Sequence, residues 1–201
     1  MASIYDLKPK FQSLLRPCTR WLAGRGVTPN HVTVTALVLS FVVGGLVWRW
    51  DTSRWPLLVV PVFLFVRMAL NAMDGMLARE HNLASDLGAV LNELGDVLSD
   101  AALYLPFARL PGLPAGLIVV VVVLGVISEM TGVIAVQIGA SRRYDGPMGK
   151  SDRAFVFGLV ALLLGLGVPA GRWLAGAFGV VLALLVVTVV NRARKALREV
   201  G

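Results

Sequence analysis

The sequence has little of the charge that a soluble protein needs. Only 15% of its 201 residues are charged, 57% are hydrophobic, and the mean hydropathy is +0.76. A soluble domain of this length has a much larger polar share with which to cover its surface. The composition therefore excludes a soluble globular domain and indicates an integral membrane protein.

Cysteine and histidine are also scarce. Cys18 is the single cysteine, so no disulfide can form within the chain. The two histidines, His31 and His81, are better explained as helix-cap or loop residues than as metal ligands. Strict alternation of apolar and polar residues, which is typical of a membrane β-barrel, is missing as well. A bundle of helices, which pairs every backbone polar group internally, is the remaining way to cross a bilayer.

Long apolar runs are what the sequence has in abundance. They approach the roughly 20 residues that cross about 30 Å of hydrocarbon as a helix. We predict an all-α membrane protein, a single domain over residues 1–201, with six transmembrane helices and an N-terminal interfacial amphipathic helix. The interfacial helix is expected at 4–25, and the spans at 30–48, 55–80, 85–107, 113–140, 152–168 and 171–192.

Positive charge is unevenly divided between the two sides of this predicted bundle. If the N-terminus is cytoplasmic, the opposite side receives only four basic residues: Arg49, Arg54, Arg109 and Arg172. This bias predicts a multi-pass protein of the cell membrane with both termini and the functional face in the cytoplasm. A basic belt beside anionic headgroups accounts for the pI of 10.3 without nucleic acid, for which no binding module is present.

One polar stretch interrupts the apolar runs. Two successive predicted helices carry polar or small residues along one face: Asn71, Asp74 and Ala78 in the first, and Gly88, Asn92, Asp96 and Asp100 in the second. Because the connection between them is short, the two helices should be antiparallel neighbours. Asn71, Asp74, Asn92 and Asp96 are therefore expected to share a polar pocket near the cytoplasmic boundary.

Two interpretations of this pocket are open on spacing alone. A carboxylate inside a membrane is costly unless a partner neutralises it, and a hard divalent cation such as Mg²⁺ prefers carboxylate and carbonyl oxygens. Arg79 could supply part of the neutralising charge. Alternatively, the polar residues hold neighbouring helices together by hydrogen bonds and an interfacial charge pair.

The stretch resembles the signature of the CDP-alcohol phosphotransferase family. That signature is D-x-x-D-G-x-x-A-R, eight further residues, then G-x-x-x-D-x-x-x-D, and this sequence agrees at six of its eight positions. The exceptions are Asn71 and Asn92, where the family has aspartates. The TPN motif at Thr28 to Asn30, the expected six spans and the segment GPMGKSDR also resemble the family's layout.

The resemblance implies a phospholipid-synthesising transferase. Such enzymes transfer a phosphatidyl group from CDP-diacylglycerol, or another CDP-alcohol, to an alcohol or alcohol phosphate and release CMP, and they are commonly homodimers. Mg²⁺ or Mn²⁺ would be held by Asn71, Asp74, Asn92 and Asp96, with Asp96 also acting as the catalytic base. The nucleotide would be bound by five residues of the motif: Asp74, Gly75, Ala78, Arg79 and Gly88.

The acceptor side is less specific. Arg142, Lys150 and Arg153 would bind the phosphate of an acceptor that has one, or they are topology determinants that touch lipid headgroups. Glu129 either lines the same cavity or forms hydrogen bonds between helices.

The two asparagines leave three outcomes open. The site holds one cation instead of two, Glu93 or Asp100 compensates, or catalysis has been lost. We expect retained activity, because the nucleotide-facing residues, the base and the basic loop are all present. The alternatives are a catalytically impaired CDP-lipid-binding homologue or partner subunit, and a small transporter whose intramembrane acids carry ions.

Overall fold

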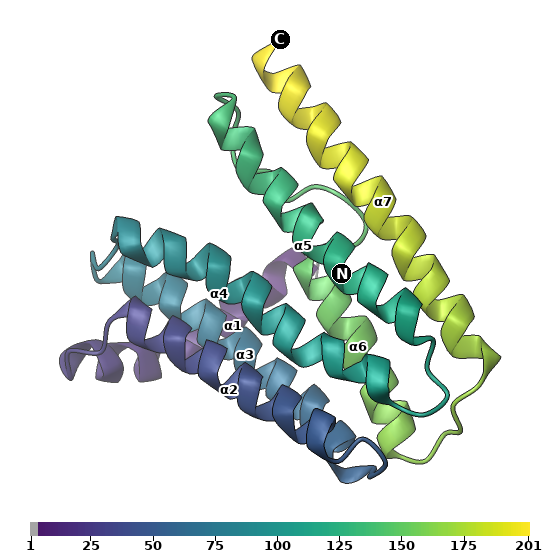
Figure 1. Ribbon diagram of the computed structural model, residues 1–201. Helices are drawn as coiled ribbons and strands as arrows, with labels where there is room; N and C mark the ends of the chain where they lie inside the picture. The colour runs from purple at the N-terminus through teal and green to yellow at the C-terminus, as the bar shows by residue number, and fades with distance from the viewer. Residues whose placement is uncertain (1–3) are drawn as a thin grey trace. The chain divides into compact units, whose positions relative to one another are not determined.

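The computed structural model describes the backbone of residues 4–201 and the side chains from residue 9 onward. The side chains of residues 1–8, among them Lys8 of the basic N-terminal segment, lie outside the described residues. Within this range every regular element is helical, which confirms the all-α prediction. The elements are α1 (Ile4–Gly24), α2 (Pro29–Arg49), α3 (Trp55–Glu80), α4 (Asp86–Tyr104), the 3₁₀ helix η1 (Leu105–Arg109), α5 (Ala115–Gln137), α6 (Lys150–Gly165) and α7 (Arg172–Val200) (Figure 1).

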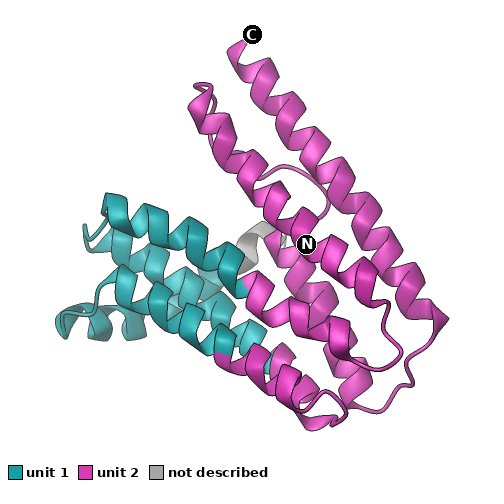
Figure 2. Cartoon of the chain, in the orientation of Figure 1, with its two compact units in different colours: residues 1–41, 62–99 teal, residues 42–61, 100–201 magenta. Residues whose placement is uncertain are grey.

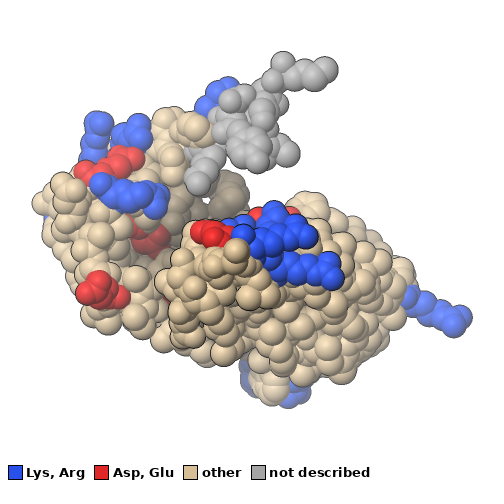
Figure 3. Space-filling view, turned by 90° about the horizontal axis from the view of Figure 1, so that it is seen from above, with Lys and Arg blue, Asp and Glu red and all other residues tan. Residues whose placement is uncertain are grey.

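Four of the described helices, α2, α3, α5 and α7, are long and apolar enough to cross a membrane. Helix α4 carries several acidic residues, and α6 has 16 residues, about 24 Å of helix. Many large apolar side chains are exposed on the outside of the helices, for example Val62 and Phe65 on α3. On the face drawn in Figure 3, charged residues form small patches in a surface that is mostly uncharged. The structure thus agrees with a membrane protein, while the full set of six spans stays a prediction.

The described chain divides into two compact units (Figure 2). Unit 1 is formed by residues 1–41 and 62–99, and unit 2 by residues 42–61 and 100–201. Helices α2, α3 and α4 therefore each contribute residues to both units. The single domain expected from the sequence stays a prediction.

In unit 1, α1 packs against α3 through one aromatic and one ionic contact. The rings of Phe11 and Phe65 meet edge to face with centroids 6.1 Å apart. Arg16 donates two hydrogen bonds to the carboxylate of Glu80, at 3.0 and 3.1 Å. The opposite side of α1 leaves Leu14 exposed at 78% of its surface. An exposed apolar face of this kind suits the interfacial position predicted for this helix.

The ends of the unit 1 helices are fixed by short polar contacts. Thr28 caps α2, because its hydroxyl accepts a hydrogen bond from the His31 amide while the His31 ring accepts one from the Thr28 amide. This confirms the cap role expected for His31. After α3 the chain turns at Asn82, whose φ of 54° lies in the left-handed region that asparagine tolerates. The Ser85 hydroxyl then accepts from the Gly88 amide at the start of α4.

Unit 2 has an aromatic core. The ring of Phe157 stacks on Tyr104 at 4.1 Å between centroids and contacts Phe107 and Phe178 edge-on or tilted. All four side chains are buried, at 1% exposure or less. Helices α5 and α7 run side by side in this unit (Figure 1).

Several helix ends differ from the expected spans: α4, α5 and α6 each end three residues early, and α7 ends eight residues late. Helix α4 ends at Tyr104 and not at 107, because Pro106 lacks the amide that would continue the α-helical pattern and the chain tightens into η1. Helix α7 continues to Val200, beyond the apolar run, through a charged last segment that includes Arg194 and Arg198. The glycine-rich connection between α5 and α6 contains two turns with positive φ, +88° at Gly139 and +121° at Gly146.

Candidate functional site

The polar stretch of the sequence lies on the facing sides of α3 and α4 in unit 1. Asn71 of α3 donates from Nδ2 to Oδ1 of Asp96 on α4 across 3.5 Å. Asn71 and Asp96 are both half-buried. The structure therefore brings together one residue from each half of the signature.

Asp74 lies one turn after Asn71 and is buried, with 6% of its surface exposed. Its Oδ2 accepts a hydrogen bond of 3.0 Å from the hydroxyl of Thr33 on α2. A methyl group built on Gly95 of α4 would lie 3.3 Å from the Thr33 methyl, so α2 and α4 approach closely at the same level. Three helices thus meet at Thr33, which touches α3 through Asp74 and α4 through Gly95. The contribution of Thr33 was missed in the sequence because nothing there marks its partner.

Arg67 is a second participant that sequence reasoning missed. Its guanidinium donates to the backbone oxygen of Asp96 at 3.1 Å and lies 3.7 Å from Oδ1 of the same residue. Arg67 is 3% exposed, although it stands in the apolar part of α3. Its spacing is the signal that could have found it, because Arg67, Asn71 and Asp74 follow one another at intervals of four and three on one helix face.

The residues assigned to the nucleotide lie at the ends of the same two helices. A Cβ on Gly75 would come within 2.9 Å of the Arg79 guanidinium, so this exposed arginine folds back over bare backbone. A Cβ on Gly88 would lie 2.9 Å from Oδ1 of Asn30, the last residue of the TPN motif. Ala78 is half-buried, and its carbonyl accepts from the Leu83 amide beyond the end of α3.

The donors available to a metal ion are few. No group of three or more His, Cys, Asp or Glu side chains suited to a metal occurs among the described residues. The candidate ligands are the carboxylates of Asp74 and Asp96, with the amide oxygens of Asn71 and Asn92; Asn92 is exposed. All are hard oxygen donors of the kind that Mg²⁺ and Mn²⁺ accept, but together they carry only two formal negative charges, those of Asp74 and Asp96. The set fits a divalent cation.

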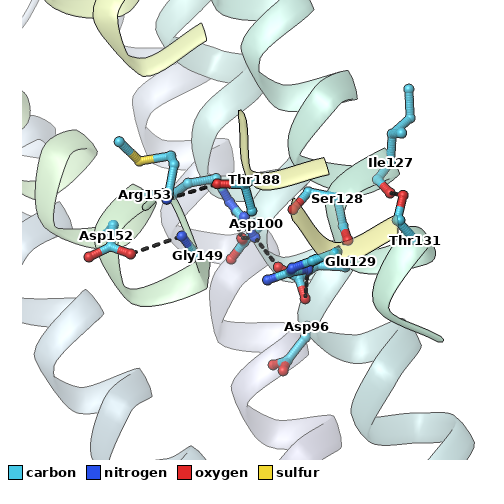
Figure 4. A network of polar contacts seen from close by, with 12 residues as sticks. Asp96, Asp100, Ile127, Ser128, Glu129, Thr131, Gly149, Asp152, Arg153 and Thr188 are labelled. Atoms are coloured by element: carbon cyan, nitrogen blue, oxygen red, sulfur yellow. Dashed lines mark hydrogen bonds and ion pairs between the residues drawn. The ribbon is translucent and has the colours of Figure 1, made fainter. Parts of the chain in front are cut away.

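Two of the three residues assigned to the acceptor, Arg142 and Arg153, belong to an ionic network in unit 2 whose carboxylates are buried. Arg153 of α6 is 3% exposed and pairs with Asp100 at 2.9 Å and Glu129 at 3.1 Å. Glu129 also pairs with Arg142 at 3.1 Å and Arg192 at 3.2 Å. Figure 4 shows Asp100, Glu129 and Arg153 pointing toward one another from three helices. Glu129 was expected either to line the acceptor cavity or to form polar contacts between helices, and the structure shows the polar contacts.

These contacts bear on Asp100 and on two of the acceptor residues, Arg153 and Lys150. Asp100, one of the acids that could have compensated for the asparagines, is already engaged by Arg153. Arg153 also keeps a buried donor, Nη1, for which the described residues provide no hydrogen-bond partner. Lys150, the first residue of α6, is half-buried.

A second ionic cluster lies outside the helical spans, in the connection between α5 and α6. Asp145 pairs with Lys195 and Arg143, each at 2.7 Å. The hydrogen bond from Lys195 is the largest effect, and it lowers the pKa of the Asp145 carboxyl below its ordinary value. Burial opposes it, and the hydrogen bond from Arg143 lowers the pKa further. Arg143 also binds Glu199 near the end of α7 at 2.6 Å. These contacts tie the connection to the last turns of α7.

Comparison with known proteins places this arrangement in a family. The family model described as CDP-alcohol phosphatidyltransferase matches residues 26–190. Inner membrane protein YnbA of Escherichia coli (strain K12) is 45% identical over 197 residues, which cover 97% of this chain and 96% of that protein. The archaetidylinositol phosphate synthase of Pyrococcus horikoshii is 29% identical over 97 residues, 48% of this chain and 49% of that protein.

Solved structures of Mycobacterium tuberculosis phosphatidylinositol phosphate synthase (PgsA1) share the fold. The structure with CDP-DAG bound has a TM-score of 0.77 at 19% identity and covers 92% of this chain and 94% of that one. The complex with manganese and citrate has a TM-score of 0.74 at 20% identity, covering 92% and 90%. The family match confirms both the resemblance seen in the signature and the class of enzyme expected from it. The chain belongs to the CDP-alcohol phosphatidyltransferase family.

Proposed function

We propose that this protein transfers the phosphatidyl group of CDP-diacylglycerol, or the equivalent group of another CDP-alcohol, to an alcohol or alcohol phosphate and releases CMP. The observation that carries the proposal is the convergence of signature residues in unit 1, where Asp96 contacts Asn71 and Thr33 holds Asp74. Family membership supports the reaction class, and the PgsA1 structures with CDP-DAG and with manganese support the donor and the metal.

The proposed reaction is a single displacement at phosphorus. The acceptor oxygen bonds to the phosphorus that carries the lipid, the bond from that phosphorus to the bridging oxygen breaks, and CMP leaves with the bridging oxygen. Asp96 accepts the acceptor's proton. A bound Mg²⁺ or Mn²⁺ would neutralise the diphosphate, held by Asp74 and Asp96 with the amide oxygens of Asn71 and Asn92.

The protein's own residues would bind and orient the nucleotide. Gly75 and Gly88 leave helix backbone accessible to it, and Arg79 lies over Gly75 with a fork of donors suited to a diphosphate. In unit 2, Arg142, Arg153 and Arg192 lie around Glu129, and the second buried carboxylate is that of Asp100. Three positive charges therefore face two negative charges, and one positive charge remains. With the spare Nη1 donor of Arg153, this charge suits a polar or anionic acceptor bound by Arg142, Lys150 and Arg153.

We extend the proposal to the setting of the enzyme. The chain is a multi-pass protein of the cell membrane with six spans, α1 in the interface, both termini and the active site on the cytoplasmic side, and a homodimeric assembly. The distribution of basic residues supports the orientation, and the exposed apolar side chains of the helices support the bilayer.

The test is CMP release by the purified protein. CDP-diacylglycerol with Mg²⁺ or Mn²⁺ and a panel of alcohols and alcohol phosphates should give CMP with at least one acceptor. The double variant Asn71→Asp, Asn92→Asp restores the family's four acids and serves as a matched positive control. If neither protein released CMP with any acceptor, the result would contradict the proposal.

A second candidate function is a CDP-lipid-binding homologue with impaired catalysis or a partner subunit. It is favoured by one observation, that Asn71 offers Asp96 an N–H group where the family has a carboxylate. It predicts that a CDP-alcohol binds, that no CMP is released, and that Asp96→Ala leaves the lipid composition of the cell unchanged. A missing headgroup class in cells carrying Asp96→Ala would exclude it.

A further inference from the structure

Arg67 is a buried charge in an apolar helix. Its neighbours in the chain are Val66 and Met68, and 3% of its own surface is exposed. A guanidinium in such a place is costly unless other groups compensate for it, so a buried arginine in a membrane helix points to a function.

Arg67 of α3 contacts Asp96 of α4. The guanidinium contacts both the backbone oxygen and Oδ1 of Asp96, at 3.1 and 3.7 Å. The amide nitrogen of Asn71 reaches the same Oδ1 from 3.5 Å. Oδ1 of Asp96, the proposed base, therefore faces N–H groups from two successive turns of α3.

These donors occupy the position that a second cation would need. Two-metal sites place their ions about 3.5–4 Å apart, commonly with carboxylate oxygens between them. A cation bound to Oδ1 of Asp96 would meet the positive ends of the Arg67 and Asn71 N–H groups and would have to displace both.

Formal charge leads to the same conclusion. Asp74 and Asp96 carry two negative charges, and Arg67 cancels one of them. A single divalent cation leaves a small positive charge, which the diphosphate of a CDP-lipid can balance. A second cation would add two more positive charges with no carboxylate at positions 71 and 92 to meet them.

We propose that Arg67 is a positioning residue that stands in for a second divalent cation beside Asp96, so that this site binds one cation, on the Asp74 side. The proposal rests on the proposed function for the substrate, whereas the number of cations is measured independently of turnover. It would explain how a site with two asparagines keeps the Asp96 side chain oriented.

The experiment is a Mn²⁺ titration of the purified protein in lipid nanodiscs, followed by electron paramagnetic resonance without substrate. We expect one Mn²⁺ per chain with the six-line spectrum of an isolated ion. A stoichiometry of two with the broadened multi-line spectrum of a coupled pair would overturn the proposal.

Three variants test the part assigned to Arg67. Arg67→Gln removes the charge and should raise Mn²⁺ affinity about fivefold or more, since repulsion on the cation is lost. Arg67→Lys keeps the charge and should retain the wild-type affinity. Arg109→Met is the matched control, because it removes an exposed guanidinium that pairs with Asp51, and it should change nothing. Unchanged or weaker binding by Arg67→Gln would contradict the proposal.

A triple variant tests directly whether Arg67 takes the place of a second cation. Arg67→Met with Asn71→Asp and Asn92→Asp should bind a second Mn²⁺ and give the coupled spectrum, and one isolated ion in the folded triple variant would contradict the proposal. If the triple variant does not fold, Arg67→Gln and Arg67→Lys decide. CMP release is assayed separately, so one bound ion without turnover refutes the proposed function alone, and two bound ions with turnover refute this inference alone.

Discussion

Asp96 is the residue on which the proposed chemistry depends most. It is half-buried, accepts hydrogen bonds from α3 and stands at the position of the signature proposed as the base. Asp74, by contrast, is buried against Thr33 and is better placed to hold a cation than to move a proton. We therefore propose the role of base for Asp96, in addition to its part in holding the cation, and a cation-holding role alone for Asp74.

Replacement of Asp96 by asparagine should remove activity while it preserves shape. The variant Asp96→Asn keeps the size of the side chain but cannot take the acceptor's proton, so CMP release should fall about 100-fold or more. Asp86→Asn, in the exposed first turn of the same helix, is the control and should retain wild-type rates. Equal rates for Asp96→Asn and wild type would exclude Asp96 as the base.

The sequence predicted part of this site because part of it is local. Helical spacing and a short connection were enough to expect that Asn71 and Asp96 would meet, and they do. Arg67 and Thr33 were not assigned, because a single arginine or threonine in an apolar run carries no sign of its partner on another helix. Their roles depend on how three helices pack, which spacing within one helix does not determine.

Among the helices, α4 packs against α2 at its first turn. Gly88 lies against Asn30 there, and a methyl group at this position would come within 2.9 Å of the asparagine oxygen. The sequence predicted the start of α4 to within one residue but not its end, since the break at Pro106 shortens the helix. The missing amide hydrogen of Pro106 sets that boundary, and the apolar content of the segment does not reveal where the helix ends.

Gly88→Ala should therefore weaken this junction. We expect a loss of about 1–3 kcal/mol in stability from overpacking, and weaker CDP-lipid binding, because Asn30 must move. The control is Gly116→Ala near the start of α5, where a new Cβ would meet nothing within 4 Å and helix propensity should improve. Thermal unfolding in detergent and CDP-lipid titration check both. Similar effects of the two substitutions would contradict the account.

The connection between α5 and α6 should respond to acid through Asp145. Its pKa is lowered by Lys195 and Arg143, so its stabilising effect is complete above the unfolded value near 4 and disappears as pH falls through the folded value. Asp145→Asn should cost about 0.5–1 kcal/mol at pH 7 and nothing near pH 2. Unfolding temperatures of the two proteins, compared across this range, provide the check. A difference that persists or grows in acid would contradict it.

At the scale of the whole molecule, the chain contains two compact units with different polar interiors. Unit 1 holds the signature residues, and unit 2 holds an ionic network in which Glu129 joins arginines from α6, α7 and the connection before α6. The sequence marked Arg142 and Arg153 as basic residues on the rim. It could not show that buried acids engage them, because the partners are far apart in the chain.

Glu129→Gln should destabilise the protein strongly. The substitution leaves Arg153 and Arg192 buried with one carboxylate fewer, and breaking a buried ion pair costs about 3–5 kcal/mol. Glu199→Gln, whose carboxylate pairs with Arg143 at the exposed end of α7, should cost far less. Denaturant or thermal unfolding in detergent measures both. Equal costs would show that the Glu129 network is not a stabilising core.

The most direct test of the central claim follows the phosphorus that carries the lipid. CDP-diacylglycerol labelled on that phosphate is mixed with the purified protein, a divalent cation and an acceptor. The account predicts that the label passes into a new lipid that contains the acceptor, while unlabelled CMP appears in equal amount and Asp96→Asn gives neither. Label that remains in CDP-diacylglycerol with every acceptor, or that moves equally well with Asp96→Asn, would contradict it.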